Sequence, residues 1–168
     1  GALVEVEQAG VLLLGSSGVG KSETALELVD RGARLAADDV VELFLGQDGQ
    51  LLGKAAELIR HLVEIRGLGI LDLRDLYGPA AVCPQAPVDL VCRLEPWREG
   101  AAYERVGLER PTETLLGVTL PSLLLPVRAS ANMALLIELA VREHRARDRG
   151  SSAAARLDAR LRGETDDG

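Results

Sequence analysis

The chain has 168 residues and a formal net charge of −7, because 26 aspartates and glutamates outnumber 19 lysines and arginines. This length suits a single domain, and the acidic balance argues against nucleic acid as a main partner, since a phosphate backbone requires a concentrated basic surface. No apolar run approaches a membrane span or follows a secretory signal pattern, and Cys83 and Cys92 lack metal-binding spacing, so we expect a soluble cytoplasmic protein.

The first residues predict a β-hairpin that leads into a phosphate-binding loop. Residues 3–7 alternate apolar and polar side chains, and residues 11–14 form an apolar run after a turn. A hairpin here makes the sheet mixed rather than purely parallel. The loop is the sequence Gly15-Ser16-Ser17-Gly18-Val19-Gly20-Lys21-Ser22, and residues 22–31 follow it with the apolar spacing of a helix.

This loop matches the full pattern that holds nucleoside triphosphates. Its glycines let backbone N–H groups surround phosphate oxygens, Lys21 reaches the β and γ phosphates, and Ser22 offers its hydroxyl to Mg²⁺ at a helix N-terminus, whose dipole favours anions. The alternative is a glycine-rich turn without a ligand. The complete pattern, placed between a strand and a helix, favours the nucleotide site.

The middle of the chain predicts strands, a helix and loops in alternation. A strand over residues 33–37 ends at Asp38-Asp39, and another over residues 40–45 runs into a turn. Apolar spacing predicts a helix over residues 54–63, and glycines and prolines predict a loop over residues 74–85. The later expected segments are a strand over residues 88–94, a charged connection over residues 98–110, and strands over residues 112–120 and 123–127 that are separated by Pro121.

The C-terminal part predicts two helices of unequal strength. Residues 132–147 carry an apolar stripe, with Ser130 or Asn132 as the N-cap. Residues 153–162 predict a weaker helix, which is either a frayed terminus or a helix that docks on a partner. We therefore expect one catalytic domain over residues 1–149, and a weak helix with a disordered tail over residues 150–168.

A phosphate-loop enzyme also needs a carboxylate near the metal and a group that orients or deprotonates the nucleophile. Three strand ends offer one: Asp38-Asp39, Asp72 and Glu95. The adjacent pair is the best candidate, because one carboxylate can face the metal and the other the acceptor. Neighbouring side chains on an extended strand point in opposite directions, so this division requires the chain to turn there. A purely structural cap is the alternative.

Several stretches together resemble the C-terminal catalytic domain of the bacterial HPr kinase/phosphorylase family. The resemblance runs from Gly1 to about His144. It is carried by the phosphate loop with the following Glu23, by Arg34-Leu35-Ala36-Ala37-Asp38-Asp39, and above all by the family signature, Glu64-Ile65-Arg66-Gly67-Leu68-Gly69-Ile70-Leu71-Asp72. Further similar stretches are Val88 to Trp97, Tyr103-Glu104-Arg105-Val106-Gly107 and Pro126-Val127-Arg128.

The resemblance implies an α/β fold of the phosphoenolpyruvate-carboxykinase-like type, with a mixed sheet and flanking helices. It also implies an enzyme that uses ATP and Mg²⁺ to phosphorylate a serine of the phosphocarrier protein HPr, in the control of carbohydrate metabolism. Members also reverse the reaction with inorganic phosphate, releasing pyrophosphate, and are usually hexamers. The implied roles are Lys21 on phosphates, Ser22 and Glu64 on Mg²⁺, Asp38-Asp39 as the base, and Arg105 as an active-site cation.

The chain departs from the family pattern in three respects. The family places a histidine directly before the glycine that corresponds to Gly1, and this sequence begins one residue too late to show it, so that this histidine is either cut off or absent. This sequence also lacks the family's N-terminal domain, as expected of the shorter members. Where the family carries Gly-Arg-Asn, this chain has Ser130-Ala131-Asn132. Arg128 remains nearby and can supply part of the lost positive charge. We therefore expect a kinase with weak reverse phosphorolysis.

Two other functions are compatible with the residues. A small-molecule kinase would share the phosphate loop but would act on metabolites. A nucleotide-binding regulatory module would bind without catalysing, and Ala131 motivates this alternative, whereas the retained Asp38, Asp39, Glu64 and Arg105 argue against it. A GTPase is disfavoured, because no Asn-Lys-x-Asp motif for reading guanine is present.

Overall fold

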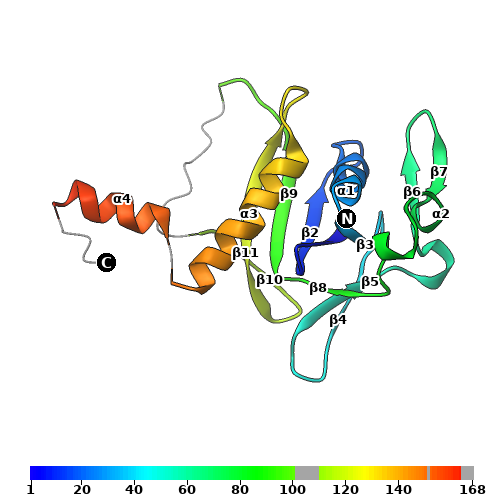
Figure 1. The fold of residues 1–168 in the computed structure, drawn as a ribbon, viewed down its shortest axis with the longest axis horizontal. Helices are drawn as coiled ribbons and strands as arrows, with labels where there is room; N and C mark the ends of the chain where they lie inside the picture. The colour runs from blue at the N-terminus through cyan, green and yellow to red at the C-terminus, as the bar shows by residue number, and fades with distance from the viewer. Residues whose placement is uncertain (101–109, 151, 164–168) are drawn as a thin grey trace.

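The computed structural model describes residues 1–100, 110–150 and 152–163. Its centre is a six-stranded sheet in the order β10-β11-β9-β2-β1-β3 (Figure 1). The strands are β1 (Ala2–Val6), β2 (Ala9–Gly15), β3 (Arg34–Ala37), β9 (Leu90–Pro96), β10 (Thr112–Leu115) and β11 (Val118–Val127).

Strand directions bring four carboxyl ends to one edge of this sheet. β9 runs parallel to both β2 and β11, whereas β1 is antiparallel to its neighbours β2 and β3. Hence β2, β3, β9 and β11 all point the same way. The predicted hairpin and mixed sheet are confirmed, and the shared edge is where open α/β sheets usually bind ligands.

The sheet lies between two layers. α1 (Lys21–Asp30) and α3 (Met133–Asp148) cover one face, and the small sheet of β4 (Glu42–Leu45), β5 (Leu51–Lys54) and β8 (Ala86–Pro87) covers part of the other. The alternation along β1 explains this arrangement, since Val4 packs into the core on the helical side and Leu3 into the core on the opposite side. Such strands are apolar on both faces because both faces are covered.

A separate two-stranded hairpin lies beside α1 (Figure 1). It is formed by β6 (Leu62–Ile65) and β7 (Gly69–Asp72), between η1 (Glu57–Ile59) and the short helices α2 (Leu73–Tyr77) and η2 (Pro79–Ala81). Its base is anchored by the buried side chains of Val63 and Leu73, and Leu73 N–H donates to the carbonyl of His61 at 3.0 Å. The tip extends away from both sheets.

The predicted helix over residues 54–63 is wrong. The chain there ends β5, makes the single turn η1 and begins β6. Leu58, one of the apolar residues on the expected helical stripe, is 90% exposed, whereas Ala55 is buried in the core. His61 has a φ of 69°, which no right-handed helix allows.

Two further boundaries differ from expectation. The predicted loop over residues 74–85 contains α2 and η2, and Asp72 caps the first of them. The break between the last two strands is at Leu116 and Gly117, both with positive φ, and Pro121 lies inside β11. Pro121 is tolerated there because it faces Thr112, where β10 begins, so that few ladder hydrogen bonds are lost.

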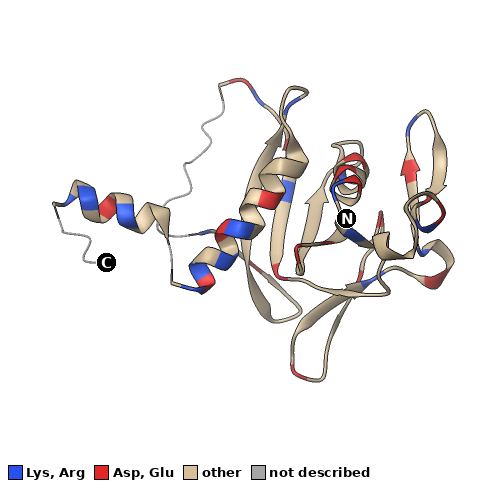
Figure 2. Ribbon diagram, viewed as in Figure 1, with Lys and Arg blue, Asp and Glu red and all other residues tan. Residues whose placement is uncertain are grey.

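The two C-terminal helices are confirmed. Asn132 is the N-cap of α3, since its side chain accepts a hydrogen bond from Leu135 N–H at 3.0 Å. α4 (Ala153–Leu161) begins at the Ser152 cap and has no buried residue. Basic side chains gather on the second half of α3 and on α4, which projects from the body (Figures 1 and 2). The tail predicted to be disordered covers residues 163–168, of which 164–168 lie outside the described residues.

Cys83 and Cys92 are both buried free thiols, and burial raises the pKa of Cys83 to about 11 and that of Cys92 to about 12. They act as packing residues. Among the described residues, no helix has the length and apolar character needed to cross a bilayer.

Candidate active site

The phosphate loop connects β2 to α1 at the shared edge of the sheet. Gly18 and Gly20 have φ values of 83° and 112°, and Gly20 is the N-cap of α1. A side chain on Gly15 would bring its Cβ within 2.5 Å of the Leu94 carbonyl oxygen. No side chain caps the described N-terminus of α1, so its first N–H groups face the loop. This is the arrangement that binds phosphate groups.

Lys21 lies over this loop. Its Nζ donates to the carbonyl oxygens of Gly15 and Ser16, both at 2.8 Å. These contacts hold the ammonium at the start of the loop, on the side of the cavity described below.

Ser22 and Asp38 meet at the end of β3. The Ser22 hydroxyl lies 3.0 and 2.9 Å from the two carboxylate oxygens of Asp38, which is only 5% exposed. Burial raises the pKa of Asp38, and the hydrogen bond from Ser22 partly offsets this rise. Because β3 runs in the same direction as β2, two residues that are distant in sequence are brought together at the sheet edge.

Asp39 is next to Asp38 but faces different surroundings. It is exposed and has a φ of 65°, and Val40 N–H donates to the carbonyl of Asp38 at 2.8 Å. This three-residue turn bends the chain directly after β3. The turn that a division of work between the two carboxylates requires is therefore present.

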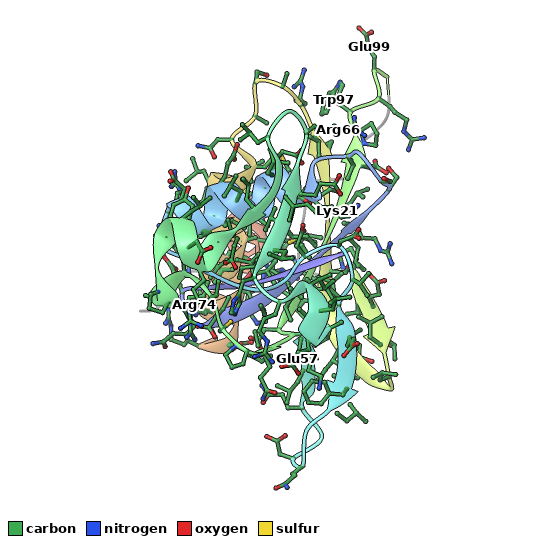
Figure 3. The ribbon with its side chains drawn as sticks, turned by 90° about the vertical axis from the view of Figure 1, so that its right-hand side faces the viewer. Lys21, Glu57, Arg66, Arg74, Trp97 and Glu99 are labelled. Carbon is green, nitrogen blue, oxygen red and sulfur yellow. The ribbon has the colours of Figure 1, made fainter. Side chains whose placement is uncertain are left out.

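These groups surround a cavity of about 450 Å³. The phosphate loop, the start of α1 and the end of β3 line it, and the β6–β7 hairpin contributes Glu64 and Arg66. Lys21 and Arg66 are labelled in Figure 3. The lining residues are Gly1, Ser17, Gly18, Gly20, Lys21, Ser22, Glu23, Asp38, Asp39, Glu64 and Arg66.

Two of the carboxylates considered from the sequence have other roles. Asp72 is the N-cap of α2, where it accepts from the N–H groups of Arg74 at 2.9 Å and Asp75 at 3.3 Å. Glu95 lies 3.8 Å from Arg98 and does not line the cavity. Of the three strand-end candidates, only the pair at the end of β3 is among the described residues that line the cavity.

The remaining predicted residues lie elsewhere or outside the described part. The guanidinium of Arg128 stacks 3.8 Å from the ring centroid of Trp97, beyond the cavity. Ala131 lines a separate hollow beside Glu27. Arg105 falls among residues 101–109, which the structure does not describe.

The donor set fits a Mg²⁺ ion shared with a nucleotide. Mg²⁺ is usually held by one or two carboxylates together with substrate phosphates. Ser22 and Asp38 offer a hydroxyl and a carboxylate in contact, and Glu64 lines the same cavity. Within residues 1–100, 110–150 and 152–163, no group of three His, Cys, Asp or Glu side chains is arranged to hold a metal alone.

Sequence reasoning missed Arg66 as a residue of the site. It follows Glu64 by two positions within the signature run, and Gly67, with a φ of 91°, makes the turn that carries it. A charged residue directly before a turn glycine was the available signal.

The glycine-rich loop lies at the carboxyl edge of a mixed sheet. Lys-Ser follows it at the start of a helix, and an aspartate at a strand end faces it. This arrangement defines a phosphate-loop nucleotide-binding domain. Comparison with family models identifies which one. Residues 1–161 match the HPr Serine kinase C-terminal domain. The chain belongs to this family.

Individual proteins agree with this assignment. The chain is 49% identical over 161 residues to an HPr kinase/phosphorylase of Caldicellulosiruptor bescii, and 50% identical over 161 residues to that of Caldanaerobacter subterraneus subsp. tengcongensis. These matches cover 96% of this chain and 52% and 53% of the relatives, so the chain spans about half their length.

A solved structure confirms the fold. The structure of the Hpr(Ser) kinase/phosphatase from Coxiella burnetii matches with a TM-score of 0.81 at 35% identity, over 89% of this chain and 90% of that one. The predicted α/β fold with a mixed sheet and flanking helices is therefore correct.

Proposed function

We propose that this chain is the catalytic domain of an ATP- and Mg²⁺-dependent kinase that phosphorylates a serine of the phosphocarrier protein HPr. The family and the names of its relatives support the substrate. The observation that carries the chemistry is the division between two adjacent carboxylates, with Asp38 buried on Ser22 and Asp39 open to the cavity beside the phosphate loop.

Each group has a defined task in binding. The N–H groups of the loop and Lys21 hold the β and γ phosphates, and Ser22, Asp38 and Glu64 are the residues that would hold Mg²⁺. The bound metal ion would neutralise phosphate charge and polarise the γ-phosphoryl group. The loop and α1 fix the phosphates, and the turn after β3 fixes the base.

In the transfer step, Asp39 accepts the proton of the serine hydroxyl while the serine oxygen bonds to the γ-phosphorus. The bond from that phosphorus to the β–γ bridging oxygen breaks, and ADP leaves with its electron pair. Asp39 is the base because it is exposed toward the cavity, whereas both oxygens of Asp38 lie against Ser22.

The reverse reaction uses the same groups. Asp39, now protonated, returns its proton to the serine oxygen as inorganic phosphate takes the phosphoryl group and forms pyrophosphate. We propose that this direction is weak, because Ala131 supplies no charge where the resembled family has arginine. Arg105 and Arg128 are proposed as additional cations for the anionic substrates, and an oligomer of the chain in the cytoplasm as its working form.

Incubation of the chain with purified HPr, Mg²⁺ and γ-labelled ATP tests the proposal. We expect label on an HPr serine, and little pyrophosphate when serine-phosphorylated HPr is mixed with millimolar phosphate. Lys21→Ala should remove transfer and leave the fold intact, since the bonds of this side chain to the described residues are to loop carbonyls.

Lys54→Ala is the matched control, because Lys54 stacks on Phe44 in the small sheet, away from the cavity. Transfer by the Lys21→Ala variant at the wild-type rate would refute the site assignment, and unlabelled HPr with a labelled small molecule would refute the substrate.

A further inference from the structure

Arg66 is a cation placed directly against the phosphate loop from another element. It lines the cavity with Lys21, and a Cβ on Gly18 would lie 3.2 Å from its Nη2 atom (Figure 3). The two cations therefore flank the loop at different points, Lys21 at the carbonyls of Gly15 and Ser16 and Arg66 at Gly18.

Nothing within the described residues neutralises Arg66. It is exposed at the tip of the β6–β7 hairpin, and among residues 1–100, 110–150 and 152–163 it makes no hydrogen bond or ion pair. The guanidinium thus lines the cavity with no described residue bonded to its donors. Guanidinium donors match the oxygens of a phosphate group in a bidentate geometry.

The charge balance of the cavity makes this cation important. Four lining carboxylates, those of Glu23, Asp38, Asp39 and Glu64, face two lining cationic side chains, Lys21 and Arg66. A triphosphate adds further negative charge to this space. Removal of either one leaves a single cationic side chain among the described residues that line the cavity.

We propose that Arg66 binds the terminal phosphoryl group of the nucleotide and so distinguishes a triphosphate from a diphosphate. This inference rests on the proposed function, because it assumes a nucleotide in this cavity. The terminal group is chosen for two reasons. Arg66 shares its hairpin with Glu64, one of the residues that would hold the Mg²⁺ that neutralises phosphate charge. Asp39, the proposed base next to the reacting phosphorus, lines the same cavity.

The hairpin therefore acts as one unit that brings a carboxylate to the metal and a guanidinium to the transferred group. During transfer, the donors of Arg66 remain on the phosphoryl oxygens while the bond to ADP breaks and the bond to serine forms. Arg66 itself gains and loses no proton.

Binding measurements on the full chain test this role apart from catalysis. Affinities for Mg²⁺ with a non-hydrolysable ATP analogue, and for Mg²⁺ with ADP, are compared by calorimetry for wild type, Arg66→Gln, Arg66→Lys and Arg74→Gln. Arg74 is the control, because it is exposed on α2 directly after the same hairpin, away from Lys21 in Figure 3, and does not line the cavity.

We expect Arg66→Gln to weaken the triphosphate analogue by about 10- to 100-fold, the range of one charge-assisted contact, and to change ADP affinity by less than about threefold. Arg66→Lys keeps the charge but loses the fork, so its loss should be intermediate. Transfer to HPr should fall with triphosphate affinity in the same order. Arg74→Gln should match wild type in every measurement.

Equal weakening of both nucleotides, or of neither, by Arg66→Gln would overturn the inference. A wild-type chain that binds no nucleotide would overturn it together with the proposed function. A chain that binds with the expected pattern but leaves HPr unlabelled would refute only the proposed substrate. Arg66→Gln is not expected to unfold the chain, since Arg66 makes no bond to the described residues. Arg66→Lys is a second variant that tests the same contact with the charge kept.

Discussion

Asp38 and Asp39 show how one residue step places two carboxylates in different surroundings. Asp38 is 5% exposed and its oxygens contact the Ser22 hydroxyl, whereas Asp39 is exposed and held by a φ of 65° in a turn. An acidic residue in the left-handed region is tolerated because its short polar side chain suits that conformation. The backbone turn is what allows adjacent carboxylates to serve one cavity.

The two carboxylates should therefore fail differently when each is replaced by an amide. Asp39→Asn should reduce serine phosphorylation by a factor on the order of 10² or more, the usual scale for a general base, and leave nucleotide affinity unchanged. Asp38→Asn should raise the Mg²⁺ concentration needed for half-maximal nucleotide binding. Both quantities are measured on the same preparations, and normal transfer by Asp39→Asn would exclude it as the base.

Asp38→Asn should also stabilise the ligand-free chain. Burial raises the folded-state pKa of Asp38 above its unfolded value, so folding takes up a proton and stability falls as pH rises through that range. The amide removes this cost. In urea unfolding, we expect the variant to exceed wild type at neutral pH and the difference to vanish at acid pH, below the usual aspartate pKa. A variant less stable than wild type at neutral pH would contradict this account.

At the residue level, the sequence predicted the groups with a local pattern. The phosphate loop, Lys21, Ser22 and the strand-end pair all follow from spacing within a few residues. The contact of Ser22 with Asp38 and the approach of Arg66 to Gly18 depend on how β3 and the β6–β7 hairpin fold against the loop. No periodicity within the chain encodes such contacts.

At the scale of elements, turns with positive φ decide where strands end. The β10–β11 hairpin turns at Leu116 and Gly117, with φ values of 47° and 79°. Two consecutive positive φ values are typical of a type I′ turn, which prefers Asn-Gly. Leu116 is a poor residue for this position, because a leucine adopts a positive φ at a higher cost than asparagine does. Its side chain is also 55% exposed, so little burial compensates for that cost.

Leu116→Asn should raise the free energy of unfolding by about 0.5 to 1 kcal/mol, because asparagine adopts the left-handed conformation at lower cost. Thermal unfolding measures the gain. Thr114→Asn is the control, since Thr114 is in the same hairpin but within the β10 ladder, where asparagine has no such benefit. An unchanged midpoint for Leu116→Asn would show that the leucine is not strained.

A residue with positive φ also explains the main error among the elements that were expected from the sequence. Residues 54–63 have helical apolar spacing, yet His61 with its φ of 69° and the burial of Ala55 against the small sheet produce two strand ends around one turn. A short apolar run fits a strand as well as a helix, and the tertiary packing decides between them. By contrast, the predictions of α1 and α3 were confirmed. Both helices have periodic apolar residues, and α1 begins after Gly20 while α3 begins at the Asn132 cap.

At the scale of the whole molecule, α4 is peripheral to the fold. It has no buried residue, and Leu157 and Leu161 are 58% and 78% exposed. Figure 1 shows it projecting away from the sheet and its helices. The division between a catalytic domain over residues 1–149 and a C-terminal segment remains a prediction, and this geometry supports it.

Removal of residues 150–168 should leave the thermal midpoint of the monomer within roughly 2 °C and leave nucleotide affinity unchanged, because none of the described residues in this range is fully buried. Removal of residues 141–168 is the control, since it deletes the fully buried Val141 and should destabilise the chain clearly. Loss of nucleotide binding on the shorter truncation would place residues 150–168 within the catalytic unit.

The position of the β6–β7 hairpin outside both sheets has a consequence for local stability. An isolated two-stranded hairpin is marginal in water, and here only its base, at Val63 and Leu73, reaches the core. Its amides at 62–65 and 69–72 should therefore exchange hydrogen through local opening, at a lower free energy than those of β2 and β9 in the sheet centre. A ligand that is held by both Asp38 and this hairpin raises the free energy of that opening, because the ligand must be released before the hairpin opens. Slower exchange of these amides on addition of nucleotide would then report occupancy of the cavity.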